Sequence, residues 1–440
     1  MAVELLPSEN GCPPRTTICV KFVVDGKVTV EEMEEIINNK WLVNDNSYPE
    51  LKQYVDYFMG FMFWKPDTEF NLKNHLKSHT LWETNIENQS IIEQKVCQFL
   101  EELLNKPFTP KRSPWEFYII NNYRNEQLKN QGVHEEMTLI VLRVHHALAD
   151  GFSLAYAVIG DLFETPEQKN ALPIPKPKSF WEMMLLVFTA IFRFPYELTN
   201  FIGLVYHPRT PLHTTDERRG CKLLYERNDA FPVQRIKEIK RKLGVSFSGV
   251  LLTAISAAVA KSQHELQRKK GGNFKSIERT PFGIPLPLSR NSKKLQNSWA
   301  GTYLQLPTKL ELDSMERLRD VEEQLQQARK SIIPFMFLVL TKSVGLLFPS
   351  MTKYLTKNRL LPAGFSSFPG SGVDVYVTGK KVLMTDVLGG IHNGVTGVGF
   401  MILSFGSCIR VSAMAIEGTV NREELKKMLG CVQEEFDNLE

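Results

Sequence analysis

Length, composition and charge bound what this chain can be. At 440 residues it exceeds the roughly 250–300 residues that one hydrophobic core can serve, so two domains or a two-lobed body are expected. Hydrophobic residues make up 43% of the chain and charged residues 23%, which excludes wholesale disorder. The 53 basic and 49 acidic residues give a formal net charge of +4, and this balance argues against a dedicated nucleic-acid-binding protein.

The first 165 residues alternate between strand and helix patterns. A strand is predicted at 16–24 and a helix over 28–42, followed by an amphipathic helix at 91–106. Strands at 114–123 and 136–144, joined by a polar loop, predict a hairpin. Apolar residues recur at helical spacing directly after this hairpin, so a strand-to-helix turn is expected near residue 150.

Three prolines in residues 171–179 indicate an extended linker and a lobe boundary near residue 170. We therefore expect an N-terminal lobe at 1–170, a linker with an apolar segment at 171–225, and a C-terminal lobe at 226–440. Further elements are predicted in this lobe: helices on either side of Gly244, strands at 279–290 and 301–310, a helix over 314–331, strands at 373–378 and 408–415, and a last helix at 421–437.

Two apolar stretches bear on membrane contact. Within 180–206 the uncharged run lasts only from Met183 to Phe192, whereas a spanning helix needs about 20 apolar residues. A helix that lies on the bilayer surface fits better, with a transmembrane span at 181–206 as the alternative. The stretch 331–351 is interrupted by prolines and a lysine, and a buried core helix explains it equally well. Together the two stretches favour a protein that rests on a bilayer and receives apolar substrates from it.

Cysteine usage and the N-terminus give no sign of secretion. Residues 1–15 have an early acidic residue and no continuous apolar core, so no signal peptide is predicted. We expect free thiols, a reducing compartment and no metal site, because no C-x-x-C pair or metal-ligand spacing occurs among the six cysteines: Cys12, Cys19, Cys97, Cys221, Cys408 and Cys431.

The segment His-His-Ala-Leu-Ala-Asp-Gly, residues 145–151, is the strongest candidate for a chemical site. Acyl transfer to an alcohol needs a base for the hydroxyl proton, and a histidine such as His146 titrates in the right range. Asp150 could fold back towards the imidazole, and Gly151 would allow a tight turn. A purely structural interpretation competes: Asp150 caps the following helix, and His145 and His146 merely end a strand.

This segment resembles the His-His-x-x-x-Asp-Gly signature of the CoA-dependent acyltransferase superfamily. Five other blocks resemble, in order, those of the wax ester synthase/diacylglycerol acyltransferase family: FNLKNHLKSHTL (70–81), PFTPKRSPWE (107–116), IPLPLSR (284–290), QNSWAGTYLQLP (296–307) and SSFPGSGVDVYVTGKKV (366–382). The resemblance implies an α/β fold like that of chloramphenicol acetyltransferase, with two similar lobes and the active site in a channel between them.

The resemblance also implies roles for single residues. His146 would be the general base, His145 a supporting residue, and Asp150 the residue that holds the geometry. Arg290 would be a partner for Asp150, with a solvated strand-end arginine as the alternative. Asn297 would bind substrate or merely turn a loop.

The chain departs from the family pattern at a few positions, which leaves its substrate range open. Phe108-Thr109 replaces Leu-Asp, Gln296 stands in place of a glycine, and Phe368 interrupts the Ser-Asn-Val-Pro run.

By the same resemblance, acyl-CoA is the expected co-substrate and no cofactor is expected. The acceptor would be diacylglycerol, giving triacylglycerol, or a long-chain alcohol, giving a wax ester, at a membrane such as the endoplasmic reticulum or a lipid-droplet surface. Two alternatives remain: a condensation-type acyltransferase that uses carrier-bound substrates, and a catalytically silent lipid-binding protein on the same scaffold. A serine hydrolase is disfavoured because no Gly-x-Ser-x-Gly motif occurs.

Overall fold

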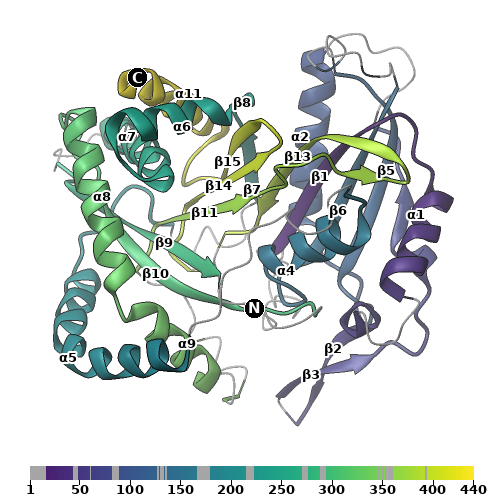
Figure 1. Cartoon of the computed structure of the whole chain (residues 1–440), viewed down its shortest axis with the longest axis horizontal. Helices are drawn as coiled ribbons and strands as arrows, with labels where there is room; N and C mark the ends of the chain where they lie inside the picture. The colour runs from purple at the N-terminus through teal and green to yellow at the C-terminus, as the bar shows by residue number, and fades with distance from the viewer. Residues whose placement is uncertain are drawn as a thin grey trace.

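Two mixed β-sheets with attached helices form two lobes that lie side by side (Figure 1). The structure is a computed structural model. It describes a few isolated residues and the ranges 16–42, 48–59, 61–81, 89–125, 136–165, 179–214, 222–269, 276–287, 294–344, 360–391 and 394–440.

The N-terminal lobe is built on a six-stranded sheet with the order β12-β13-β1-β6-β5-β4. Its strands are β12 (Tyr376–Val377), β13 (Lys380–Gly389), β1 (Thr17–Asp25), β6 (Met137–His145), β5 (Trp115–Tyr123) and β4 (Leu76–Ser78). Only the β4–β5 pair is parallel. The helices of this lobe are α1 (Val30–Ile37), α2 (Gln89–Asn105) and α4 (Gly151–Ala155), and α4 continues as a wider helical turn over Tyr156–Leu162.

Both faces of this sheet are covered, which explains why its central strands are apolar throughout instead of alternating. Phe22 and Val24 of β1 belong to the core that contains α1, whereas Cys19 and Val23, which point the other way, pack in the core that contains α2. The predicted hairpin is confirmed, because β5 and β6 pair antiparallel.

The C-terminal lobe has a seven-stranded sheet with the order β10-β9-β11-β14-β15-β7, and β8 pairs with β15. The strands are β7 (Leu223–Arg227), β8 (Phe231–Pro232), β9 (Arg279–Pro287), β10 (Trp299–Pro307), β11 (Ala363–Pro369), β14 (Val398–Phe405) and β15 (Cys408–Ile416). Its helices are α5 (Phe180–Val205), α6 (Val233–Leu243), α7 (Phe247–Lys269), α8 (Ser314–Lys330), α9 (Ile333–Val344) and α11 (Arg422–Leu439).

Several predicted elements of this lobe are confirmed, among them α8, α11 and the helix pair around Gly244. Gly244 ends α6 with a φ of 68°, a conformation that costs glycine little. Strands β7, β11 and β14 were not predicted. The strand expected at 373–378 is only the two-residue β12.

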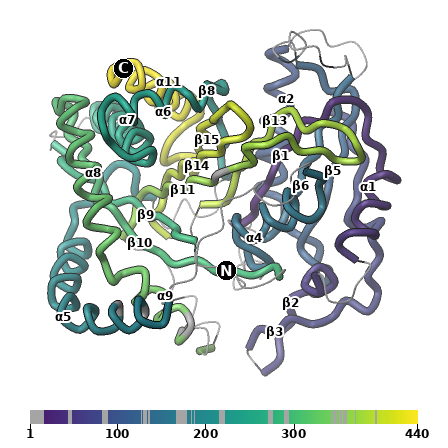
Figure 2. Tube along the Cα trace, viewed as in Figure 1, coloured from purple at the N-terminus to yellow at the C-terminus, as the bar shows by residue number. Residues whose placement is uncertain are grey.

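Strand β13 crosses from one lobe to the other. It pairs with β1 from Ile18 opposite Gly389 onwards, and Figure 2 shows it in yellow-green beside the purple β1. The predicted C-terminal lobe, 226–440, therefore contributes residues 376–389 to the sheet of the N-terminal lobe. A boundary at one residue number therefore does not separate the two sheets. Without β13, strand β1 would have an unpaired edge.

A buried ion network holds the two sheets together at this crossing. Asp386 of β13 binds Lys21 of β1 at 2.5 Å, Arg410 of β15 at 2.6 Å and Arg227 of β7 at 3.1 Å. Arg227 also pairs with Glu93 of α2. The three cations hold the pKa of the Asp386 carboxyl far below its usual range despite burial.

We expect Asp386→Asn to lower the free energy of unfolding by about 3–5 kcal/mol, because it removes the shared partner of three buried cations. Urea denaturation of the purified variant measures this change. The matched control is Asp374→Asn, which removes the carboxylate from an exposed pair with Lys381 at 2.8 Å and should cost less than about 1 kcal/mol. Equal losses in the two variants would contradict the role of the network.

Candidate active site

His146 lies where β6 ends between two neighbouring strands. Its backbone N–H donates to Thr16 O at 2.8 Å, and the N–H of His145 donates to Pro114 O at 2.9 Å. The sheet therefore fixes the backbone of both histidines. The chain then turns over residues 146–148 and enters α4 at Gly151, as the predicted strand-to-helix turn requires.

Asn297, from the segment that leads into β10, determines the tautomer of His146. Its Nδ2 donates to the carbonyl oxygens of His146 at 2.8 Å and Ala147 at 3.0 Å, which fixes the orientation of the amide. Its Oδ1 lies 2.9 Å from His146 Nδ1 and can only accept, so Nδ1 must carry the proton. In the neutral ring Nε2 is then the unprotonated nitrogen, which is the form a general base needs.

The surroundings keep this imidazole neutral. Burial lowers the pKa of His146, while the hydrogen bond to Asn297 and the negative charge of Asp150 act in the opposite direction. The His146 side chain is half-buried and that of Asn297 is exposed. The ring is therefore neither in bulk water nor sealed in the core.

His145 has a different environment and serves the fold. It is fully buried, and its Nδ1 accepts from the backbone N–H of Ala147 at 3.0 Å. Its Nε2 must then carry the proton and donate to Thr16 Oγ1 at 2.9 Å. Burial lowers the pKa of His145 to about 3. Both ring nitrogens are used within the protein, so His145 supports the turn and has no nitrogen left to act as a base.

Asp150 joins the two lobes. One carboxylate oxygen accepts from the backbone N–H of Ser153 at 2.7 Å, and the other accepts from that of Ser298 at 2.6 Å. The Asp150 N–H also donates to Gln296 O at 3.2 Å. The carboxylate thus does not fold back to hydrogen-bond the imidazole. The helix-cap interpretation explains one of its oxygens, and the bond across the lobes explains the other.

The structure corrects the reason for Gly151. This glycine begins α4 with no positive φ, so a tight turn does not require it. A Cβ placed there would lie 2.3 Å from Cε1 of Phe368, whose ring comes across from β11 in the other lobe. The glycine is therefore required for space.

The remaining site prediction, Arg290, lies outside the described residues. Thr16 and Ser298 were not predicted as site residues, because each acts on the site through contacts between segments far apart in sequence. Ser298 directly follows Asn297 in the block 296–307, and this was the one sequence signal that could have identified it.

Two of the family-like blocks pack behind β6. His75 lies stacked on Trp115 with ring centroids 4.3 Å apart, and it is fully buried. The guanidinium of Arg143 lies 3.7 Å from the ring centroid of Phe108 and donates to Glu116 at 3.1 Å. The ring of Phe108 in turn meets His145 edge-on at 5.8 Å. Phe108 and Arg143 therefore support His145 from one face of the sheet, and His75 and Trp115 pack together in the core of the N-terminal lobe.

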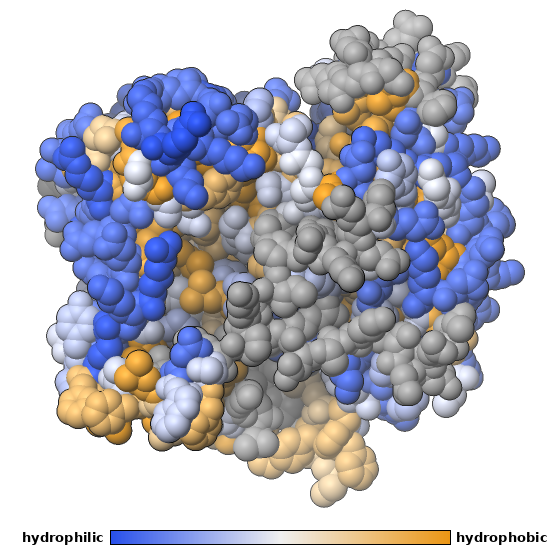
Figure 3. Space-filling view, in the orientation of Figure 1, coloured by the Kyte–Doolittle hydropathy of each residue, from blue (hydrophilic) through white to orange (hydrophobic). Residues whose placement is uncertain are grey.

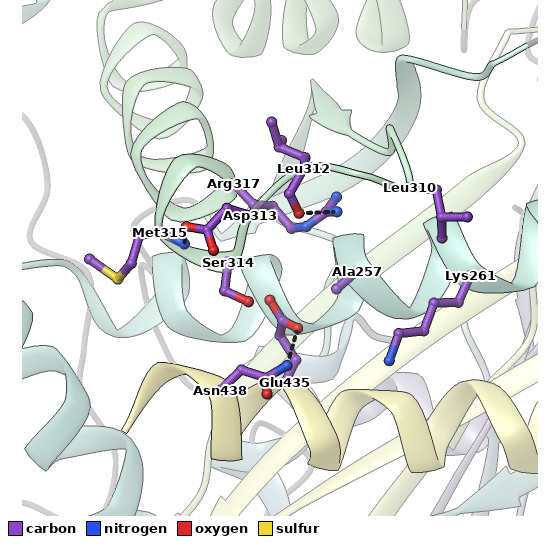
Figure 4. A pocket seen from close by; sticks show the side chains of 10 residues that line it. All are labelled: Ala257, Lys261, Leu310, Leu312, Asp313, Ser314, Met315, Arg317, Glu435 and Asn438. Atoms are coloured by element: carbon purple, nitrogen blue, oxygen red, sulfur yellow. Dashed lines mark hydrogen bonds between the residues drawn. The ribbon is translucent and has the colours of Figure 1, made fainter.

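A pocket of about 440 Å³ lies elsewhere, between α7, α8 and α11 (Figure 4). Its charged groups have structural partners: Arg317 donates to Lys309 O at 2.9 Å, and Glu435 accepts from Asn438 at 3.2 Å. None of the predicted site residues that the structure describes lines it. Within the described ranges, no cluster of three or more histidine, cysteine or acidic side chains could hold a metal ion.

Known proteins share this architecture. A wax ester synthase/diacylglycerol acyltransferase from Marinobacter aquaeolei is 14% identical with a TM-score of 0.61, over 96% of this chain and 94% of that chain. A trichothecene 15-O-acetyltransferase from Fusarium sporotrichioides is 11% identical with a TM-score of 0.63, over 100% and 94%. The starter condensation domain of rhizomide synthetase, in complex with C8-CoA and Leu-SNAC, is 12% identical with a TM-score of 0.58, over 100% and 91%. No curated protein matches the sequence significantly.

These likenesses confirm the predicted class, the two-lobed α/β fold of CoA-dependent acyltransferases. Residues 295–440 match the family model of the WS/DGAT C-terminal domain. The resemblance to the wax ester synthase/diacylglycerol acyltransferase family is thus supported over the C-terminal third of the chain, and this match together with the fold supports an acyltransferase.

We expect Gly151→Ala to lower the free energy of unfolding by about 1–3 kcal/mol, because the new methyl group overlaps the ring of Phe368. Gly160→Ala is the matched control, since its Cβ would meet only Tyr156 at an ordinary 3.9 Å. Thermal denaturation measures both variants. The loss should shrink in a Phe368→Ala background, and an unchanged loss there would show that another contact is responsible.

Proposed function

We propose that this protein transfers an acyl group from acyl-CoA to the hydroxyl group of a lipid alcohol, with His146 as general base. The observation that carries the proposal is the hydrogen bond from His146 Nδ1 to Asn297 Oδ1 at 2.9 Å, which leaves Nε2 to accept a proton. The family model over residues 295–440 supports acyl transfer as the reaction class.

In the proposed reaction, both substrates are bound at once. Nε2 of His146 takes the alcohol proton as the oxygen attacks the thioester carbon, and a tetrahedral intermediate forms. Its collapse breaks the C–S bond, and the imidazolium returns the proton to the thiolate sulfur of CoA. Ester and free CoA leave, and the imidazole is neutral again. A positioned base contributes about 10²–10⁴-fold to such a step.

Helix α5 supports a lipid acceptor, because its apolar side chains are exposed whereas a charged side chain is buried. At 100° per residue, its exposed apolar side chains from Phe180 to Phe192 fall within an arc of about 160°. Arg193 and Glu197 lie on the opposite side, where Glu197 is buried and accepts from the backbone N–H of Ile332 at 3.3 Å. The charged side of the helix faces the protein and the apolar side faces outward, which favours contact with a bilayer.

The same helix favours lying on the membrane over spanning it. By length and composition α5 could cross a bilayer. It contains Pro195, and Figure 1 shows it changing direction along the lower left of the C-terminal lobe. Glu197 also attaches the helix to the protein through its hydrogen bond with Ile332. We therefore propose that α5 lies on the membrane surface. The enzyme would be membrane-associated, at the endoplasmic reticulum or a lipid droplet. Diacylglycerol and long-chain alcohols are the proposed acceptors.

Ester formation from labelled acyl-CoA tests this function. With diacylglycerol or a long-chain alcohol as acceptor, we expect ester product from the wild type and a loss of about 10²–10⁴-fold in His146→Ala. His264→Ala changes an exposed histidine on α7 and serves as the control that keeps wild-type activity. Wild-type ester formation by a folded His146→Ala protein would remove the mechanism. Absence of product with lipid alcohols would favour a carrier-bound substrate or a silent lipid-binding protein.

The pH profile tests the environment of the base. Because burial lowers the pKa of His146, kcat/KM should fall on the acid side only below the ordinary histidine value of about 6.5. The hydrogen bond to Asn297 raises this pKa, so Asn297→Ala should move the acid limb to still lower pH and reduce the rate at its plateau. An acid limb that stays in place in Asn297→Ala would mean that another group is titrating.

A further inference from the structure

A small β-hairpin stands apart from the two main sheets. Its strands are β2 (Gln53–Phe58) and β3 (Phe61–Pro66), which pair only with each other. The sequence of its tip, YFMGFMFW at 57–64, has eight consecutive residues without a charge. Phe58 is 68% exposed, Met59 79% and Phe63 53%. A two-stranded hairpin is only marginally stable in water, so this much exposed apolar surface requires an explanation.

The apolar surface of the tip is two-sided. Successive residues of a strand point to opposite faces, yet the neighbours Phe63 and Trp64 are both exposed, as are Tyr57 and Phe58. A strand that docks on a protein surface needs one apolar face only. Apolar side chains on both faces suit immersion in an apolar medium.

Met59 adds a second indication at the turn. Its φ of 49° lies in the left-handed region, where glycine, asparagine or aspartate is the ordinary choice. A large apolar side chain at this position, which is 79% exposed, therefore has a conformational cost. Membrane insertion supplies a reason for it, because the thioether would leave water.

The hairpin belongs to the same face of the molecule as α5 and α9. Figure 3 shows apolar atoms along the lower edge in two groups, over α5 and α9 on the left and over the hairpin on the right. Phe61 of the hairpin stacks on Phe348, which follows α9, with ring centroids 4.7 Å apart. Leu340 of α9 and Phe348 are 61% and 52% exposed. The contact between the two rings links the hairpin to the segment that follows α9.

We propose that the β2–β3 hairpin inserts into the interface of a lipid bilayer and forms a second membrane anchor, on the N-terminal lobe, beside the anchor of α5 and α9 on the C-terminal lobe. The first charges of the hairpin, Asp56 and Lys65, form an ion pair at 3.1 Å and mark the depth of insertion. Beyond Asp56 the tip has about three residues of strand and turn, or roughly 10 Å, which matches the depth of interfacial insertion.

With one anchor on each lobe, the bilayer would hold both lobes at once. Each weak contact raises the effective concentration of the other at the surface, so the loss of either anchor should weaken binding by more than its own area suggests. This inference extends the membrane contact proposed for α5, and it can be tested without measuring catalysis.

Sedimentation of the full-length protein with extruded phosphatidylcholine vesicles tests the anchor. We expect the double variant Phe58→Asp, Met59→Asp to bind at least ten-fold more weakly than the wild type. Ile91→Asp on α2, at the other end of the N-terminal lobe, places a charge on a side chain that is 43% exposed and should bind as the wild type does. Circular dichroism and thermal unfolding check that each variant is folded, and aspartate tolerates the positive φ at position 59.

A second readout places the tip in the bilayer directly. Trp64 fluorescence, taken as the difference between the wild type and Trp64→Phe, should be quenched by brominated phosphatidylcholine. Vesicle binding that is unchanged in the double variant, or a wild type that does not bind vesicles, would overturn the proposal. So would a wild type that dimerises without lipid and becomes monomeric in the double variant, because the tip would then be a surface for a second copy of the chain. Failure of the ester assay would leave these results unaffected and would count against the proposed function alone.

Discussion

A pair of hydrogen bonds across the lobes organises the candidate active site. Asn297 accepts from the ring of His146, and Asp150 accepts from the backbone of Ser298. His146 is thus attached to one sheet, and its tautomer is set by a residue that leads into the other sheet. A shift between the lobes that separates these residues would break the hydrogen bond that orients the imidazole, so the proposed chemistry depends on the placement of the two sheets.

The rest of the interface makes that placement stiff. Strand β13 completes the N-terminal sheet, and Gly389 at its end lies so close to β14 that an added Cβ would be 2.5 Å from Cε of Met401. The ion network around Asp386 combines groups from β1, β7, β13 and β15, and burial lowers the pKa of Lys21 within it. A different arrangement of the lobes would separate these groups and leave a buried charge unpaired. The free-energy cost of that unpaired charge favours the native arrangement. Phe368 against Gly151 adds a steric limit directly at the start of α4.

Sequence reasoning found what is local and missed what is long-range. The spacing of His146 and Asp150, the turn between β6 and α4, and the strongly periodic helix α8 all follow from neighbouring residues. Asn297 could be predicted as a site residue, but its contact with the ring could not, because Asn297 and His146 are 151 positions apart in sequence and meet only through packing of the lobes. The expectation for Gly151 was wrong in its reason, because the decisive atom belongs to Phe368 of β11. Residues 57–64 show no alternation of apolar and polar side chains, so the sequence pattern marked neither strand of the hairpin.

The candidate site depends on His146 being a neutral imidazole with its proton on Nδ1. Nitrogen chemical shifts of His146 in the ¹⁵N-labelled, full-length protein at pH 7 measure this directly, with assignment from the spectrum of the His146→Gln variant. The structure requires a protonated Nδ1 and an unprotonated Nε2, and the Nδ1–H signal should change in Asn297→Ala. A neutral ring with its proton on Nε2, or a ring protonated on both nitrogens at pH 7, would contradict the account.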